Sequence, residues 1–124
     1  MFAILLSLFS ACSPEIACTE IFAYSSTITL VDSSGFPIEE ADISYTVNGQ
    51  EGTYIESFGG GVFAVGGEEA GDFVVTVHAE QNIEDDPTCW NVGTGTAEYT
   101  IEADECHVIG QEIDLALTWE LLCE

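Results

Sequence analysis

The stretch ADISYTVNG, residues 41–49, decides the fold class of this chain. Apolar side chains stand at every second position, at Ala41, Ile43, Tyr45 and Val47. A period of two over such a run is typical of a half-buried β-strand. The Asn-Gly pair at positions 48 and 49 best fits a tight type I′ turn, because both positions tolerate positive φ. The stretch therefore predicts a strand followed by a hairpin turn.

Similar runs lie on both sides of this hairpin and indicate strands along the rest of the chain. The six further runs are residues 26–31, 51–58, 62–65, 73–78, 97–102 and 112–119. A long connection, residues 80–95, separates two of them, and turn-forming residues separate the others. Since no stretch keeps a helical period, we expect an all-β, seven-stranded β-sandwich of one domain, residues 20–124.

The charge of the chain excludes several functions. The 124 residues contain no Lys or Arg and 23 Asp and Glu, for a formal net charge of −23, whereas an average chain of this length has about 14 basic residues. We expect no nucleic-acid partner, because Lys and Arg supply most of the affinity for phosphate. Charge-driven docking on anionic lipid is excluded for the same reason. Repulsion among the carboxylates predicts that salt or divalent cations stabilise the fold.

The N-terminus reads as an export signal. The apolar run FAILLSLF, residues 2–9, is too short to span a bilayer, and small residues follow it before Cys12. The segment from Phe9 to Cys12 resembles the bacterial lipobox, in which the cysteine is lipidated and becomes the new N-terminus. We therefore expect a signal peptide at residues 1–11, a lipid on Cys12 and a tether at residues 12–19. The alternative is a hydrophobic N-terminal strand with a buried, free Cys12.

The cysteine count supports lipidation. The chain has five cysteines, and an odd number in an exported protein calls for an explanation. If Cys12 carries a lipid, the other four can form two disulfides, which persist in oxidising compartments. Those four are Cys18, Cys89, Cys106 and Cys123.

Four cysteines allow three connectivities, and an assumed topology selects one. In an immunoglobulin-like sandwich the first strand commonly lies parallel to the last, so we pair Cys18 with Cys106, which precede these two strands. The sixth and seventh strands then run antiparallel, which pairs Cys89, before the sixth, with Cys123, at the end of the seventh. This connectivity depends on the topology from which it follows.

Two segments resemble carboxypeptidase regulatory-like domains. One is VDSSGFPIEEADI, residues 31–43, where an Asp-Gly turn and a proline lead to a small residue that begins a strand. The other is GDFVVTV, residues 71–77, where a glycine and an aromatic residue lead into alternating valines. Small bacterial lipoproteins combine such a domain with a Cys-His-Val before the last strand, as residues 106–108 do here. The resemblance implies a transthyretin-like sandwich, usually without catalysis of its own.

Candidate chemical sites are few. His78 is expected to be a partly exposed strand residue, and Cys106 and His107 are a poor metal-ligand pair because neighbours on a strand point to opposite faces. No serine lies in a nucleophile elbow, so we expect no enzyme.

Calcium binds carboxylate and carbonyl oxygens. The candidate calcium ligands are Glu84, Asp85, Asp86, Asp104 and Glu105. Neither of these two clusters has EF-hand spacing, and solvated acidic loops are the favoured interpretation. Trp90, beside Cys89, is either a binding contact or packs on the disulfide.

The sequence thus predicts an exported lipoprotein of the bacterial cell envelope, with one non-catalytic β-sandwich that acts in binding or in envelope structure. Its partners would be the membrane, through the N-terminal lipid, and an envelope protein or polysaccharide. No cofactor is expected, with calcium as the open case. The alternative function is a secreted, calcium-stabilised adhesion or assembly subunit without a lipid.

Overall fold

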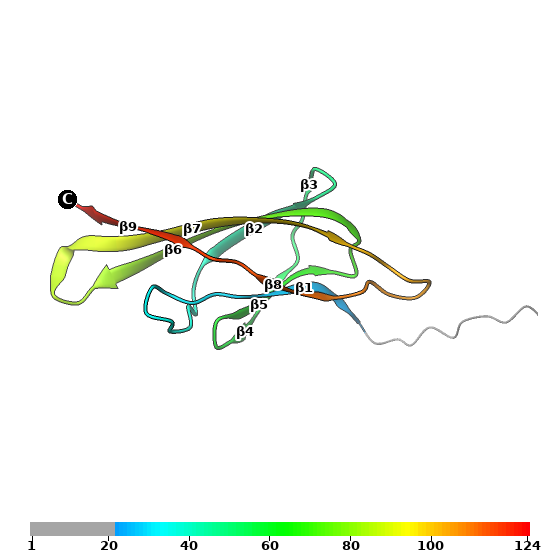
Figure 1. Ribbon diagram of the computed structural model, residues 1–124, viewed down its shortest axis with the longest axis horizontal. Helices are drawn as coiled ribbons and strands as arrows, with labels where there is room; N and C mark the ends of the chain where they lie inside the picture. The colour runs from blue at the N-terminus through cyan, green and yellow to red at the C-terminus, as the bar shows by residue number, and fades with distance from the viewer. Residues whose placement is uncertain (1–21) are drawn as a thin grey trace, which may run out of the picture.

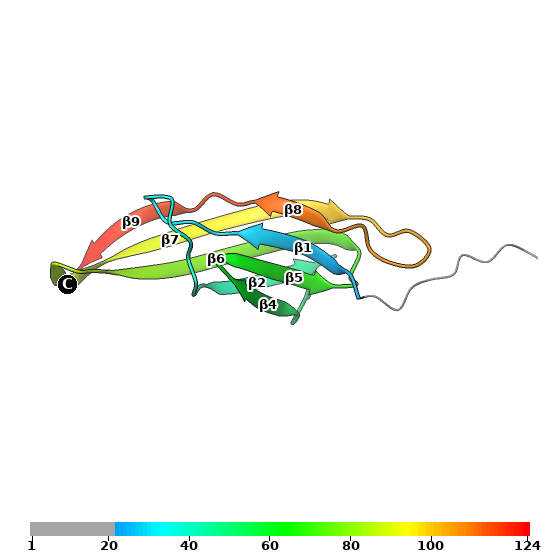
Figure 2. The same ribbon diagram turned by 90° about the horizontal axis from the view of Figure 1, so that it is seen from below.

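The computed structural model describes residues 22–124, and this part of the chain is all-β, without a helix. Figures 1 and 2 show two sheets facing each other, which is compatible with a β-sandwich. The first sheet has the order β4-β5-β1-β8 and the second β3-β2-β6-β7-β9. The first consists of β1 (Tyr24–Thr29), β4 (Ile55–Gly59), β5 (Val62–Gly67) and β8 (Gln111–Asp114). The second consists of β2 (Asp42–Val47), β3 (Gln50–Glu51), β6 (Gly71–Ile83), β7 (Asp86–Ile101) and β9 (Thr118–Cys123).

The count of seven strands is not confirmed, because two of the predicted segments are divided. Residues 51–58 contribute to β3 in the second sheet and to β4 in the first. Residues 112–119 contribute to β8 and β9, which also belong to different sheets. A strand that changes sheets keeps its alternation of apolar and polar residues on both sides of the change. The sequence pattern therefore does not reveal the crossing.

The predicted connection at residues 80–95 is wrong. β6 continues to Ile83, the turn takes up Glu84 and Asp85, and β7 begins at Asp86. The two strands pair along nearly their whole length and form a long hairpin at one end of the molecule (Figure 1). Near its tip, strand β7 of the hairpin is hydrogen-bonded to β9, which belongs to the same sheet. The side chains of residues 80–92 are exposed or half-buried, so no buried apolar face marks this part of the strands and the period of two is lost.

The predicted turn after β2 is confirmed. Asn48 and Gly49 both have positive φ, of 51° and 81°. β2 pairs antiparallel with the short β3 directly after this turn. We also predicted that the first strand lies parallel to the last one. This is confirmed for the first part of the last predicted segment, because β1 pairs in parallel with β8.

The core lies between the two sheets and is formed by their inward-facing apolar side chains. From β1, the segment after it and β5 come Ile28, Leu30, Phe63 and Val65. From the second sheet come Tyr45, Phe73, Val75, Val77, Ala79 and Ile101. Each of these is at most 4% exposed. The alternation read from residues 41–47 and 73–78 thus predicts the core face of the second sheet.

Three aromatic rings stack across neighbouring strands on that face. The Phe73 ring lies parallel to Tyr45, at 5.6 Å between centroids, and nearly parallel to Tyr99, at 5.4 Å. The Tyr45 hydroxyl donates to Glu69 Oε1 at 2.6 Å. Burial, together with this hydrogen bond, raises the pKa of Tyr45 to about 12. The stack joins β2, β6 and β7 into one inner layer.

A buried hydroxyl pair joins the two sheets. The Ser26 hydroxyl on β1 donates to the Val65 carbonyl at 2.8 Å and lies 2.7 Å from the Tyr99 hydroxyl on β7. Because the single hydroxyl hydrogen of Ser26 is used on Val65, Tyr99 donates to Ser26. Burial raises the pKa of Tyr99. Both hydroxyls are therefore satisfied inside the sandwich.

Candidate functional site

A disulfide joins Cys89 to Cys123, as the assumed topology predicts. The two residues are directly opposite in the antiparallel pairing of β7 and β9, with their Cα atoms 4.1 Å apart. The bond fastens the end of β9 to the part of β7 near the hairpin tip. This part has little core of its own, so the covalent link substitutes for packing.

Cys106 is also disulfide-bonded. Its predicted partner, Cys18, lies outside the described residues, as do the predicted signal peptide at residues 1–11, the lipidation site Cys12 and the tether at residues 12–19. Because a disulfide sulfur carries no thiolate, Cys106 is not a metal ligand in this state. This removes the pair of Cys106 and His107 from the candidate zinc ligands.

The calcium candidates do not assemble into an ion site. Glu84 and Asp85 lie in the β6–β7 turn, and Asp86 Oδ1 accepts hydrogen bonds from the Thr88 amide and hydroxyl. Among residues 22–124, no group of three or more His, Cys, Asp or Glu side chains is arranged to hold a metal ion. The Thr88 hydrogen bonds lower the pKa of Asp86.

The second candidate pair, Asp104 and Glu105, belongs to the loop between β7 and β8. Asp104 Oδ1 accepts the Cys106 and His107 amides, both at 2.8 Å. These backbone bonds lower the pKa of Asp104, with the His107 amide as the largest cause. The Asp104 carboxylate thus stabilises the backbone of the loop to which it belongs.

Each histidine contacts a carboxylate. His78 Nε2 lies 3.2 Å from Glu80 Oε2 on the outer face of β6, and both side chains are largely exposed. His107 Nδ1 lies 2.8 Å from Glu68 Oε1, in a half-buried position. Glu68 Oε1 also accepts the Ala23 amide at 2.7 Å, and this bond is the largest cause of the lowered pKa of Glu68. Both histidines therefore form ion-pair contacts when protonated.

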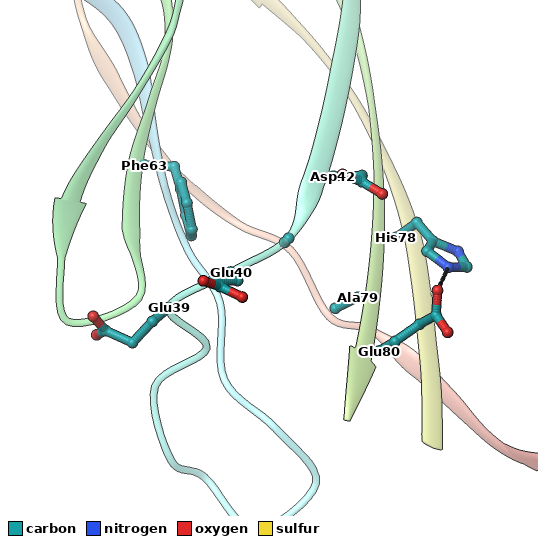
Figure 3. Close-up of a pocket in the computed structure, with 8 residues that line it drawn as sticks. Glu39, Glu40, Asp42, Phe63, His78, Ala79 and Glu80 are labelled. Atoms are coloured by element: carbon teal, nitrogen blue, oxygen red, sulfur yellow. Dashed lines mark hydrogen bonds and ion pairs between the residues drawn. The ribbon is translucent and has the colours of Figure 1, made fainter. Parts of the chain in front are cut away.

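The groove in Figure 3 has a volume of about 520 Å³ and lies where β2 begins beside β6. Carboxylates of Glu39, Glu40, Asp42 and Glu80 line it together with His78 and the Phe63 ring. Figure 3 shows the His78–Glu80 contact on one side and Glu39 on the other. The groove thus presents several carboxylates and one imidazole at an open surface.

Trp90 is half-buried on β7, between Asn82 on β6 and Leu122 on β9. Neighbouring residues on a strand point to opposite faces, so the indole lies on the face opposite to the Cys89 side chain. The expected packing of Trp90 over the disulfide does not fit this arrangement. Leu122, which is 37% exposed, is its cross-strand neighbour instead.

An exposed cluster of aromatic rings lies on the first sheet, and no pattern in the sequence indicates it. We call it the aromatic patch; its members are Phe22, Tyr24, Tyr54 and Phe58. The Tyr24 ring is central, with centroids at 5.2 Å from Phe22, 6.0 Å from Tyr54 and 5.1 Å from Phe58. Phe22 and Phe58 are each 47% exposed. The rings come from residues far apart in the chain, and only the pairing of β1 and β4 with β5 brings them together.

Small residues of β5 make room for this patch. A side chain at Gly67 would collide with the Phe22 ring. Ala64 pairs with Thr27 of β1 on one side and with Glu56 of β4 on the other. Its small side chain lies on the outer face of the sheet and is nevertheless fully buried. The rings of the neighbouring strands therefore reach each other across a strand without bulky side chains at these positions.

One carboxylate holds two of the rings. Glu56 Oε2 accepts the hydroxyl of Tyr24 at 3.0 Å and that of Tyr54 at 2.9 Å. These hydrogen bonds are the largest cause of the raised pKa of Tyr24 and raise the pKa of Tyr54 to about 12. Both tyrosines are consequently neutral hydrogen-bond donors to the Glu56 carboxylate over the physiological range.

Residues 22–124 contain no helix that could span a bilayer. Comparison of the chain with protein-family models, with curated proteins and with solved structures finds no match. The resemblance to carboxypeptidase regulatory-like domains therefore stays a prediction.

Proposed function

We propose that this chain is a non-catalytic lipoprotein of the bacterial cell envelope, whose transthyretin-like β-sandwich acts in binding or in envelope structure. One observation carries the proposal: all three cysteines in the described part of the chain are in disulfides. Disulfides persist in oxidising compartments and are rare in the cytosol. This favours an exported protein over a cytosolic one.

The odd cysteine count supports the lipid anchor. Two disulfides use four of the five cysteines if Cys18 is the partner of Cys106, and Cys12 is then left over. Cys12 follows an apolar run and small residues, the pattern that resembles a lipobox. Lipidation would thus account for the one cysteine without a disulfide partner. A single acyl chain gives only marginal membrane binding, whereas several chains on one anchor hold stably.

One arrangement, the exposed aromatic patch, supports a binding role, whereas two buried serines are structural. The serines at 25 and 26 have structural partners: Ser25 Oγ donates to the Glu69 carbonyl and accepts its amide, and Ser26 bonds Val65 and Tyr99. These hydroxyls hold the two sheets and the β5–β6 loop in place. By contrast, the aromatic patch leaves large apolar area exposed, which on a folded domain commonly marks an interaction surface.

The direction of the chain bears on where an anchor would be attached to the domain. β1 is the first described strand, and its start lies toward the end of the molecule opposite the β6–β7 hairpin tip (Figure 1). An anchor upstream of β1 would therefore be attached at the end of the domain opposite the hairpin and its disulfide. The strongly negative surface would also keep the domain from lying on anionic lipid.

The test expresses the full chain and a Cys12→Ser variant in a bacterial host and compares their membrane and soluble fractions. A Ser13→Ala variant is the matched control, since it changes the adjacent residue and leaves the cysteine. We expect the wild-type chain and the control in the membrane fraction and the Cys12→Ser variant outside it. Equal membrane association of the Cys12→Ser variant would overturn the lipid anchor.

A further inference from the structure

The aromatic patch presents negative charge and hydrogen-bond acceptors to a ligand. Both tyrosine hydroxyl hydrogens are used on Glu56 Oε2, which leaves the hydroxyl oxygens as acceptors. Among the described residues none donates a hydrogen bond to the second carboxylate oxygen, Oε1, and Glu56 is exposed. The faces of aromatic rings are themselves negative because of their quadrupole. A complementary ligand is therefore a cation that donates hydrogen bonds.

The chain itself supplies no such cation. It has no Lys or Arg, and its two histidines contact the carboxylates of Glu80 and Glu68. The net charge of −23 attracts cations to the whole surface. The patch differs from the rest of that surface because two tyrosine rings hold the carboxylate and two exposed phenylalanine rings adjoin them, so a cation there gains contact with aromatic rings as well as with charge.

We propose that the aromatic patch, with Glu56, binds the lysine or arginine side chain of a basic segment in a partner protein. The ammonium or guanidinium group would donate to Glu56 Oε1, while the aliphatic stem would cover the exposed parts of Phe22 and Phe58. This proposal rests on the proposed binding role of the domain and names the surface and the partner chemistry for it.

The hydrogen-bond inventory favours a basic polypeptide over a polysaccharide. A neutral sugar presents hydroxyls that both donate and accept, and it is held best where a site offers both kinds of group. An anionic sugar would in addition meet the carboxylate of Glu56. Lys and Arg side chains carry donors alone, which matches the acceptors of the patch.

The test titrates the full chain, purified without reductant, with a short blocked peptide of arginine and glycine in about 150 mM sodium chloride, where long-range attraction is screened beyond about 8 Å. Aromatic NMR signals of the four rings report binding at the patch. Two variants weaken the site: Glu56→Gln removes the charge and keeps an acceptor for the tyrosines, and Phe58→Leu removes one exposed ring. Each changes an exposed residue, so the fold is expected to persist.

Each variant has a matched control on another part of the surface. Glu98→Gln changes the same charge on β7, and Phe36→Leu removes a ring that is 67% exposed in the loop after β1. We expect Glu56→Gln to weaken binding about tenfold or more, because a charged hydrogen bond is lost, and Phe58→Leu to weaken it by about two- to fivefold. Both controls should bind the peptide as the wild-type chain does.

Several results would overturn the proposal. The peptide could shift signals evenly over the acidic surface, or Glu98→Gln could weaken binding as much as Glu56→Gln, and either result would mean unspecific attraction. Binding of a neutral oligosaccharide or of zwitterionic lipid vesicles at the patch, without binding of the peptide, would assign it to another ligand. The lipid anchor is tested separately by fractionation, so a cytosolic chain that still bound the peptide would refute the anchor alone.

Discussion

Cys89 and Cys123 are register partners on β7 and β9, and their disulfide joins the ends of these strands that lie beyond the main core. The bond spans 34 residues of sequence. It therefore restricts the unfolded chain over about a quarter of its length, in a part of the molecule where packing contributes little.

Removal of this disulfide should destabilise the domain clearly. For a loop of this length the chain-entropy model gives about 3–4 kcal/mol, so the double variant Cys89→Ser/Cys123→Ser should unfold at a markedly lower urea concentration. Thr94→Ser/Thr118→Ser, another register pair of the same strands, is the control and should change the free energy of unfolding by less than about 0.5 kcal/mol. Equal urea midpoints for the two double variants would show that the bond adds nothing.

The hydroxyl of Tyr99 should stabilise the packing of the two sheets against each other. Tyr99→Phe removes its hydrogen bond to Ser26, which is buried, and should cost about 1 kcal/mol in the free energy of unfolding. Tyr54→Phe removes a hydroxyl at an exposed carboxylate and should cost less. Chemical denaturation of both variants checks this, and a larger loss for Tyr54→Phe would refute the assigned roles.

All four tyrosines should titrate late. Their pKa values are raised in the folded state, those of Tyr45 and Tyr54 to about 12. Because the neutral forms are favoured by folding, this contribution to stability is complete below pH about 10 and is lost as the pH rises toward 12. The tyrosinate absorbance of the native chain should therefore rise only well above pH 10, whereas that of the chain denatured in urea should rise near pH 10. If tyrosinate formed over the same pH range in both solvents, the assignment of the hydroxyls as buried or bound to carboxylates would be contradicted.

Salt should stabilise the fold. With 23 acidic residues and no Lys or Arg, screening lowers repulsion among carboxylates more than it weakens attraction. We expect the melting temperature to rise as sodium chloride increases from about 10 mM to about 1 M. Calcium at equal ionic strength serves as the comparison. A fall of the melting temperature with sodium chloride would contradict this, and a far larger gain with calcium would favour the calcium-stabilised alternative.

The sequence predicted the parts of the fold in which one strand face is buried. Ile43 and Tyr45 on β2, and Phe73, Val75 and Val77 on β6, alternate because a single core selects them. It did not predict the hairpin tip around Asp85, where selection for a buried face is weak, or the transfer of the chain from β8 to β9.

The sites divide in the same way. The pairing of Cys89 with Cys123 followed once a strand order was assumed, because few pairings are available to four cysteines. The aromatic patch could not be predicted, since Tyr24 and Phe58 are neighbours only through the register of β5 with β1 and β4. The burial of Ser26 likewise depends on Tyr99, which is 73 residues away.

The intact mass of the chain, recovered without reduction from the membrane fraction of a bacterial host, tests the central claim most directly. The account predicts loss of residues 1–11, an added lipid mass, and a deficit of four hydrogens for two disulfides. A chain that retains Met1, carries no lipid and has five free thiols would contradict it.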